Sequence, residues 1–462
     1  MLDQTLYWLT SIPPDGRRYV GDKAFYLGRT VQHGHPIIPG VVISTTVFRD
    51  FIQGVSWSDP LFEDFPNSEL YLDTGQPWQL QSIAKQIQQA ITTTPLPGEW
   101  KAFLTKTGQS LQSPYLMCRP SISVAAQGVT TLSSKIQGLL SPHYCRTEPE
   151  AIAQAVKRTW AEAFRAKSLF VWQRAGMSLR SLQIGVLIQP IYPSLASGTI
   201  QRRGDRLEVE ACWGLGLAMK TGEVIPDRYS IHLKSGTLDA QTLGQKFYAY
   251  GRLGDDYPES WTPIPSSERR EANRRDASRW DAHRRDMRMN AGANSLSHDN
   301  VLSHYEVKHS HQQKAILSHP TLSALATLHQ SLVQQLDHDL RVEWVLGTSP
   351  AMSEPFPSEN STPTPNQILT PTLDNQQAWL YLTQVVPKAK APHSSPVSPQ
   401  LTAPETIQPP SPKLESPQAS PSTSSAPLAT PVVTALGAAP GQAIAPVWVV
   451  DERPHQSVTH LP

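Results

Sequence analysis

Cysteine and histidine, the side chains that most often bind metals or act as nucleophiles, form no recognisable motif in this sequence. The three cysteines (Cys118, Cys145 and Cys212) are odd in number and have no CxxC spacing. This argues against a disulfide framework or a zinc site and indicates a reducing compartment, so we expect a cytoplasmic protein. A group of histidines lies in a polar stretch without acidic or cysteine partners at ligand spacing, and we expect no metal there. These are His304, His309, His311 and His319.

Arginines are concentrated at 269–288, where they could contact the phosphates of a nucleic acid. Residues 272–286 consist of three pentapeptides, ANRRD, ASRWD and AHRRD, each ending in aspartate. A period of five matches neither a helix nor a strand, and acidic residues alternate with the basic ones. We therefore favour a self-neutralising charged loop over a nucleic-acid site.

The elements that would position functional side chains lie before residue 388. Apolar runs at 39–46 and 184–188 predict buried strands, and helical periodicity at 76–92 and 148–175 predicts amphipathic helices. The 462 residues carry 40 Lys+Arg and 39 Asp+Glu, which argues against a polyanion-binding protein as a whole. We recognise no signal peptide and no apolar run long enough to span a bilayer, so we expect no membrane association.

Further along the chain, residues 319–346 predict an amphipathic helix followed by a strand, and 378–386 predict a second strand. Two strands around a loop predict a hairpin. The intervening Pro/Ser/Thr-rich segment at 347–375 and the charged segment at about 251–310 are expected to be solvated insertions. The 42 prolines are concentrated after residue 347, and 388–435 is expected to be a disordered linker.

Several stretches resemble, in the same order, the nucleotide-binding domain of the phosphoenolpyruvate synthase, pyruvate phosphate dikinase and rifampicin phosphotransferase family. GDKAFYLG and IPGVVISTT, within 21–46, resemble the family's GGKxxxLG and PPGFVVTT elements. EACWGLG and TGEVIPD, within 210–227, resemble EASWGLG and SGEVTPD. RVEW at 341–344 and YLTQ at 381–384 resemble DIEW and the LLQSRP strand. One such motif recurs by chance, whereas agreement in order and spacing identifies the family.

The resemblance implies an α+β, ATP-grasp-type two-lobed nucleotide-binding domain with long disordered insertions and a disordered tail. On this basis we expect an N-terminal lobe at 1–110 and a second lobe at 111–387. LGAAPGQAIAPVWVV, within 436–462, resembles the opening of the family's swivelling phosphohistidine domain, and we expect a truncated start of that domain. The phosphorylated histidine and the pyruvate-binding part would then belong to a separate protein.

The resemblance also assigns roles in an ATP site to individual side chains. Lys23 and Arg119 would contact phosphates, and Gly138, which lacks a Cβ, would let a loop approach them closely. Gln189, at the end of a predicted buried strand, would lie near the adenine. Structural roles stay open for all four: a surface lysine, a strand-end arginine, a turn glycine and a polar strand end.

Two further side chains would serve the metal of this site. Glu343 and Gln384, on the two predicted hairpin strands, would coordinate Mg²⁺ or the phosphates attached to it. Glu343 is flanked by Val342 and Trp344 and faces away from both, so a structural salt bridge is its alternative role. The resemblance leaves no residue assigned as catalytic.

The sequence also departs from the family pattern. Val386 replaces an arginine that would stabilise charge on the transferring phosphoryl group, Arg341 replaces an aspartate, and Leu217 replaces an acidic residue. The departures favour nucleotide binding over turnover and leave two functions open. One is the ATP-binding part of a phosphoenolpyruvate-synthase-like dikinase, which transfers a phosphoryl group from Mg-ATP to a histidine elsewhere. The other is a catalytically degenerate nucleotide-binding or regulatory scaffold.

Overall fold

The computed structural model describes most of the chain up to residue 388. The described residues are 5–57, 77–123, 138–175, 177, 179, 182–265, 301–347, 372–373 and 376–388. All of them belong to one unit, Met1–Ala391. The expected arginine-rich loop, the linker after 388 and the start of a phosphohistidine domain lie outside the described residues, as does nearly all of the expected insertion at 347–375.

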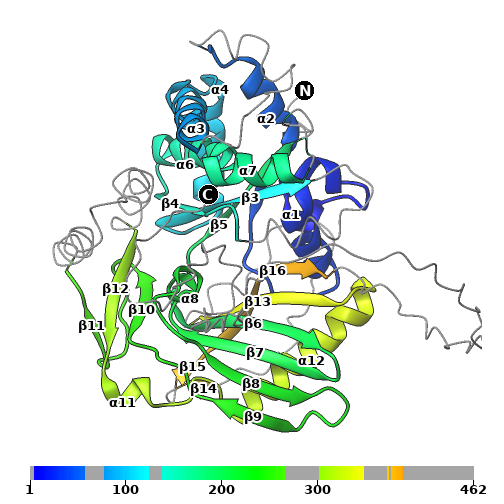
Figure 1. Ribbon diagram of the computed structural model, residues 1–462, viewed down its shortest axis with the longest axis vertical. Coiled ribbons are helices and arrows are strands. Elements are labelled where there is room, and N and C mark those ends of the chain that lie inside the picture. Colours follow the sequence, from blue (N-terminus) through cyan, green and yellow to red (C-terminus); the bar gives the residue numbers. More distant parts are fainter. Residues whose placement is uncertain are drawn as a thin grey trace, which may run out of the picture. The chain divides into compact units, whose positions relative to one another are not determined.

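A five-stranded antiparallel sheet with the strand order β1-β2-β5-β3-β4 forms the first half of the fold (Figure 1). Its strands are β1 (Leu6–Trp8), β2 (Val41–Ile43), β3 (Tyr115–Ser123), β4 (His143–Arg146) and β5 (Gln183–Pro190). The predicted strand at 39–46 is shorter than expected, because the helix α2 already begins at Thr45. The sheet takes strands from both sides of residue 110, and the division into lobes at that residue stays a prediction.

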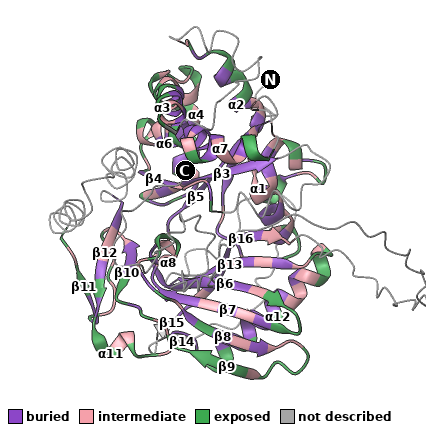
Figure 2. Ribbon diagram, viewed as in Figure 1, coloured by how far each residue is buried: buried purple, intermediate pink, exposed green. Residues whose placement is uncertain are grey.

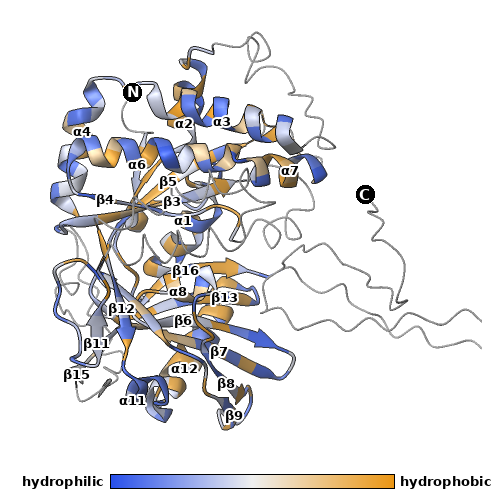
Figure 3. Cartoon of the chain, turned by 60° about the vertical axis from the view of Figure 1, so that its left-hand side comes forward, coloured by the Kyte–Doolittle hydropathy of each residue, from blue (hydrophilic) through white to orange (hydrophobic). Residues whose placement is uncertain are grey.

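Helices cover this sheet (Figure 3), and the apolar side chains of the helices and the sheet form a buried core. The predicted helices at 76–92 and 148–175 are confirmed as α3 and as α6 with α7. The apolar stripes of α3 and α6 place their isoleucines in the core, whereas Gln86 and Gln89 of α3 lie at the surface. The helical elements of this half are η2 (Leu9–Ser11), α1 (Arg17–Gln32), α2 (Thr45–Gln53), α3 (Pro77–Thr93), α4 (Glu99–Ser110), α6 (Pro149–Ala161), η4 (Glu162–Phe164) and α7 (Ala166–Arg174).

A six-stranded antiparallel sheet with the order β16-β13-β6-β7-β8-β9 forms the second half. Its central strands are largely buried, whereas the edge strand β9 is exposed (Figure 2). The strands are β6 (Ser194–Arg203), β7 (Arg206–Trp213), β8 (Asp227–His232), β9 (Leu238–Thr242), β13 (Leu340–Gly347) and β16 (Trp379–Pro387). The predicted hairpin is confirmed, because β13 and β16 pair along their whole length.

The helix α12 (His319–Leu336) packs its leucines against the apolar face of this sheet. Ser318 caps its first turn by accepting a hydrogen bond from the Thr321 amide, and Pro320 occupies the first turn, where no amide hydrogen is needed. Asp337 ends the helix in a left-handed conformation. The opposite face of the sheet is left for polar side chains, among them Thr199 and Glu343, which are cross-strand neighbours.

A three-stranded sheet with the order β10-β12-β11 lies beside the second half. It consists of β10 (Tyr248–Arg252), β11 (Trp261–Pro263) and β12 (Leu302–Val307). The expectation of a solvated segment from 251 to 310 is therefore too broad at both ends. Trp261, Tyr305 and Val307 are buried in the main core, which explains why these residues are ordered. The remaining elements are α8 (Leu217–Thr221), α11 (His309–Gln312), β14 (Thr372–Leu373) and β15 (Gln376–Gln377).

The two large sheets meet where residues 36–38 run along β16. The Leu382 amide donates to the Pro36 carbonyl at 2.9 Å, and the Ile38 amide donates to the Leu382 carbonyl at 3.2 Å. Residues 36–38 lead into β2 of the first sheet, so this contact joins β16 to the first half of the fold. Side chains from both sheets converge beside it.

Candidate functional site

Arg119, on β3 of the first sheet, is the centre of a polar cluster that spans both sheets. Its guanidinium donates to the Thr383 carbonyl, to Gln384 Oε1 at 2.5 Å and to Gln189 Oε1 at 3.4 Å. It also lies 3.5 Å from the Glu343 carboxylate. Burial lowers the pKa of Arg119, and the Glu343 charge acts in the opposite direction. A buried, multiply bonded arginine of this kind has a fixed position and a charge that is only partly balanced.

Glu343 is the acidic member of the cluster. Its Oε2 accepts from Lys220 Nζ at 2.8 Å and also faces Arg119. Burial alone would raise the pKa of Glu343, but the nearby cations Lys220, Arg119 and Lys23 lower it to about 2. The carboxylate is therefore ionised at any physiological pH. Gln384 lies directly opposite Glu343 on the neighbouring strand, which places a carboxylate and an amide side by side.

Lys23 enters the cluster from α1. The helix is kinked at Gly21, whose φ of +76° and whose contact with Ser121 exclude a side chain. A Cβ at Gly21 would lie 2.1 Å from the Ser121 carbonyl oxygen, and the Ala24 amide donates to Ser121 Oγ at 3.0 Å. This close approach of α1 to β3 brings Lys23 near Arg119. Burial, followed by the charge of Arg119, holds the pKa of Lys23 well below its usual range.

Gln189, near the end of β5, completes the connection between the halves. Its Nε2 donates to the Ile38 carbonyl at 2.8 Å, and its Oε1 accepts from Arg119. Gln189 is fully buried. The structure thus brings together five of the six expected ligand-binding residues, on five different elements. Whether they bind a ligand stays a prediction.

Gly138 is the expected residue that is not brought into the cluster. It is exposed, has a φ of +76° and lies just before β4. No hydrogen bond or ion pair among the described residues joins it to Arg119 or Glu343. Residues 124–137, which precede it, lie outside the described residues, so its proposed approach to phosphates stays a prediction.

Lys220 is a member of the cluster that the sequence interpretation missed. It lies on the five-residue helix α8, 123 positions before its partner Glu343. Its position, four residues beyond the WGLG motif, was the only available signal. That spacing gave no reason to expect a contact with a strand that follows more than a hundred residues later.

The departures from the family pattern also have defined positions. Arg341 and Val386 face each other across β13 and β16, so the two substituted positions are cross-strand neighbours. Arg341 shares a face of β13 with Glu343, two residues away. The Nε atom of Arg341 is buried, and no described residue accepts a hydrogen bond from it.

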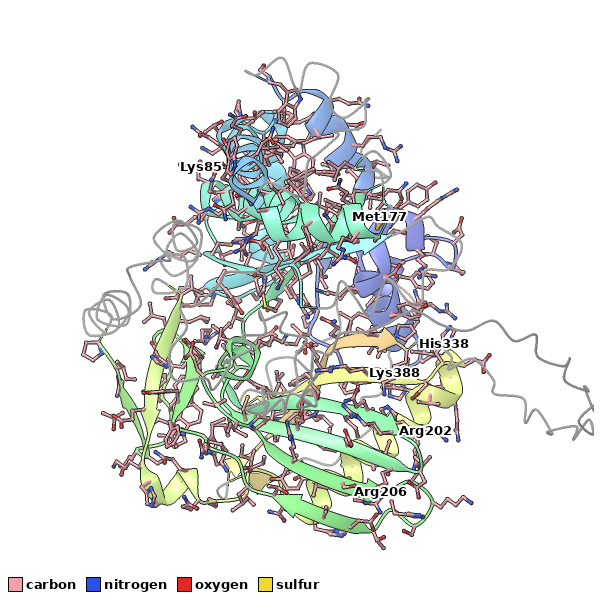
Figure 4. The ribbon with its side chains drawn as sticks, viewed as in Figure 1. Lys85, Met177, Arg202, Arg206, His338 and Lys388 are labelled. Atoms are coloured by element: carbon pink, nitrogen blue, oxygen red, sulfur yellow. The ribbon has the colours of Figure 1, made fainter. Side chains whose placement is uncertain are left out.

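At the same end of the sheet, Lys388 Nζ donates to the Arg202 carbonyl, and both residues are labelled in Figure 4.

The charges of the cluster define what it can bind. Lys23, Arg119 and Lys220 surround one carboxylate, Glu343, so the cluster carries an excess of positive charge. Unbalanced cations that are withdrawn from water favour an anion. Among the residues that the structure describes, no group of three or more His, Cys, Asp or Glu side chains could hold a metal alone. The arrangement suits an anionic ligand that brings further oxygen atoms with it.

Comparison with known proteins agrees with this chemistry. Residues 17–353 match the family model described as the AMP/ATP-binding domain of pyruvate phosphate dikinase. The chain belongs to this family. Its fold is accordingly of the ATP-grasp type, and the expected fold class is confirmed. The match covers the elements that carry Lys23, Arg119, Gln189, Lys220 and Glu343.

Individual relatives of the AMP/ATP-binding domain family are distant. A probable phosphoenolpyruvate synthase of Methanothermobacter thermautotrophicus is 26% identical over 251 residues, which cover 50% of this chain and 34% of that protein. The phosphoenolpyruvate synthase of Aeropyrum pernix is 21% identical over 234 residues, covering 49% and 28%. The rifampicin phosphotransferase of a Streptomyces species is 27% identical over 274 residues, covering 57% and 30%. The matches thus span about a third of the length of these relatives.

The described part of this family member contains no helix that is long and apolar enough to cross a membrane. All three cysteines are buried and free.

Proposed function

We propose that the cluster of Lys23, Arg119, Lys220 and Glu343 binds the polyphosphate of ATP. The observation that carries this proposal is the excess of positive charge around a single ionised carboxylate. A triphosphate would neutralise that excess and accept hydrogen bonds from all three cations. Gln189, which already accepts from Arg119 and donates to the Ile38 carbonyl, would mark the side on which the adenine binds.

Mg²⁺ is part of this proposal. Glu343 and Gln384 present a carboxylate and an amide oxygen on neighbouring strands, and both are the hard oxygen ligands that Mg²⁺ prefers. Magnesium typically takes one or two protein ligands and completes its shell with phosphates and water. The two side chains therefore fit the ion, provided that the nucleotide supplies the other ligands. When bound, the ion would neutralise charge on the phosphates.

The reaction we propose is phosphoryl transfer from Mg-ATP to a histidine on a separate domain or chain, with AMP and inorganic phosphate as the other products. In the complete system this would convert pyruvate to phosphoenolpyruvate, with the present chain as the ATP-dependent kinase component in the cytoplasm. Support comes from the family membership and from relatives named as phosphoenolpyruvate synthases.

The alternative is a catalytically degenerate nucleotide-binding or regulatory scaffold. The apolar side chain of Val386, on the polar face two residues beyond Gln384, favours it. The two functions differ in turnover. A kinase component would form AMP from ATP when mixed with the phosphohistidine domain of a phosphoenolpyruvate synthase, whereas a scaffold would bind ATP and form none.

Calorimetric titration of Mg-ATP into the full chain tests the binding proposal. We expect Lys23→Ala and Arg119→Met to weaken binding at least tenfold, because each removes a phosphate-contacting charge worth more than about 1.4 kcal/mol. Lys234→Ala, on the exposed turn after β8, is the matched control and should bind as the wild type does. Absence of ATP binding by the wild type, or equal binding by all four proteins, would refute the proposal.

A further inference from the structure

Lys220 and Arg119 both contact Glu343, but they differ in their freedom to move. The Arg119 side chain is 5% exposed and is held by Thr383, Gln384 and Gln189. The Lys220 side chain is 48% exposed, and its described polar partner is Glu343 alone. Lysine carries its charge on a flexible four-carbon chain. Glu343 therefore has one fixed cationic neighbour and one that can leave.

The position of Lys220 supports this difference. α8 has only five residues and ends at Gly222, which adopts a left-handed conformation with a φ of +77°. Lys220 lies in the last turn, and its ammonium group reaches across to β13 of the six-stranded sheet. Because about half of the Lys220 side chain is exposed, it can rotate away from Glu343 without a change in the backbone.

A divalent cation at Glu343 would compete with Lys220 for the same oxygen. Lys220 Nζ lies 2.8 Å from Glu343 Oε2, so a metal ion bound to that oxygen would lie close to the ammonium group and repel it. The ion and the lysine therefore compete for Glu343. Without a nucleotide, a lysine that leaves Glu343 loses the carboxylate that it contacts and gains no phosphate in exchange, so displacing it by metal alone is unfavourable.

An incoming polyphosphate changes this balance. It carries several negative charges to the centre of Lys23, Arg119 and Lys220, and offers Lys220 a new partner close to the old one. The charge of the ion on Glu343 is then balanced by the phosphates instead of being opposed by the lysine.

We propose that Lys220 occupies the metal position on Glu343 in the nucleotide-free protein and transfers to the phosphates when metal and nucleotide bind. This inference rests on the proposed function, because it assumes that the cluster is the site of Mg-ATP. It makes Lys220 both a ligand-binding residue and a barrier to metal binding without nucleotide. Metal and nucleotide therefore bind cooperatively, each favouring the other.

Titration of Mn²⁺ into the full chain, followed by electron paramagnetic resonance of the free ion, tests the first half. Without nucleotide, we expect Lys220→Met to bind Mn²⁺ at least tenfold more tightly than the wild type. Lys234→Met removes an equal charge from an exposed turn and should leave Mn²⁺ binding unchanged. Equal Mn²⁺ affinities for Lys220→Met and the wild type would overturn the proposal.

Calorimetric titration of ATP at saturating Mg²⁺ tests the second half. Lys220→Met should bind ATP about tenfold more weakly, while Lys220→Arg, which keeps the charge, should bind within about threefold of the wild type. An unchanged ATP affinity in Lys220→Met would overturn the transfer to the phosphates. If the wild type binds no ATP at all, the proposed function fails, and a gain of Mn²⁺ binding in Lys220→Met would then show only that the lysine blocks Glu343.

Discussion

The buried ion pair between Asp227 and Lys246 makes a sharp prediction about stability. Both side chains are fully buried, and Lys246 Nζ donates to Asp227 Oδ1. The carboxylate also accepts from the Gly244 amide at 2.8 Å, from the Ile316 amide at 3.0 Å and from the Tyr229 hydroxyl at 3.2 Å. Asp227 therefore holds two separate segments, 244–246 and the residues around Ile316, against the start of β8. Asp227, the last residue of TGEVIPD, has a structural role, and none of its hydrogen bonds in the described part of the chain involves Arg119 or Glu343.

Removing one partner of a buried ion pair lowers the free energy of unfolding by about 3–5 kcal/mol, because the remaining charge is buried without a partner. For Lys246→Met we expect the lower end, about 3 kcal/mol, because three hydrogen bonds still stabilise the carboxylate. Asp227→Asn should cost about 4–5 kcal/mol, since it leaves an ammonium group buried and turns an acceptor into a donor facing two amides. The double variant should cost less than the sum of the two.

Urea denaturation followed by tryptophan fluorescence measures these changes in the free energy of unfolding. Lys101→Met is the matched control, because Lys101 forms an ion pair of 2.8 Å with Glu150 in which both side chains are about 70% exposed. Exposed pairs contribute little, and no measurable change is expected. The reasoning is refuted if Lys246→Met destabilises the protein by less than about 1 kcal/mol, or if the two single costs simply add.

Three further predictions concern other parts of the chain. The pKa of Glu343, about 2 in the folded protein against an ordinary 4.5, is depressed. The ionised Glu343 therefore contributes at most about 3 kcal/mol to the free energy of unfolding, and this contribution is complete above pH 4.5 and lost as the pH falls towards 2. Urea titrations at several pH values should show this loss in the wild type but not in Glu343→Gln. Gly21→Ala should destabilise the protein by more than about 2 kcal/mol and abolish ATP binding, whereas Gly34→Ala, in open space but with the same positive φ, should cost only about 1–2 kcal/mol. Native protein should show no thiol reactive to Ellman's reagent and denatured protein three, because all three cysteines are buried; one fast-reacting native thiol would contradict this.

The sequence was sufficient for the local elements and for the positions that resemble family motifs. Amphipathic periods predicted α3, α6 and α12, and the strand-like runs at 340–346 and 378–386 predicted the β13–β16 hairpin, because these patterns arise within one element. The same hairpin register explains why Glu343 and Gln384 lie side by side.

What the sequence could not provide were contacts between elements far apart in the chain. Lys220 belongs to a short helix with an ordinary polar pattern, and only the packing of α8 beside β13 brings it to Glu343. The small sheet was missed for a related reason. Trp261 and Tyr305 become buried only because β11 and β12 pair with each other across a long charged segment, and a composition average over 251–310 conceals these short strands.

The contact between residues 36–38 and β16 has a consequence for synthesis of the chain. Arg119 and the Thr383 carbonyl that it contacts are 264 positions apart, so the ribosome adds the acceptor long after the donor. At roughly 5–20 residues per second, this interval lasts on the order of tens of seconds. During that time Arg119 and Lys23 have emerged without β16, and the first sheet lacks the strand that its 36–38 segment pairs with. A nascent chain would therefore gain the capacity to retain nucleotide only at the end of this domain's translation, when β16 leaves the exit tunnel.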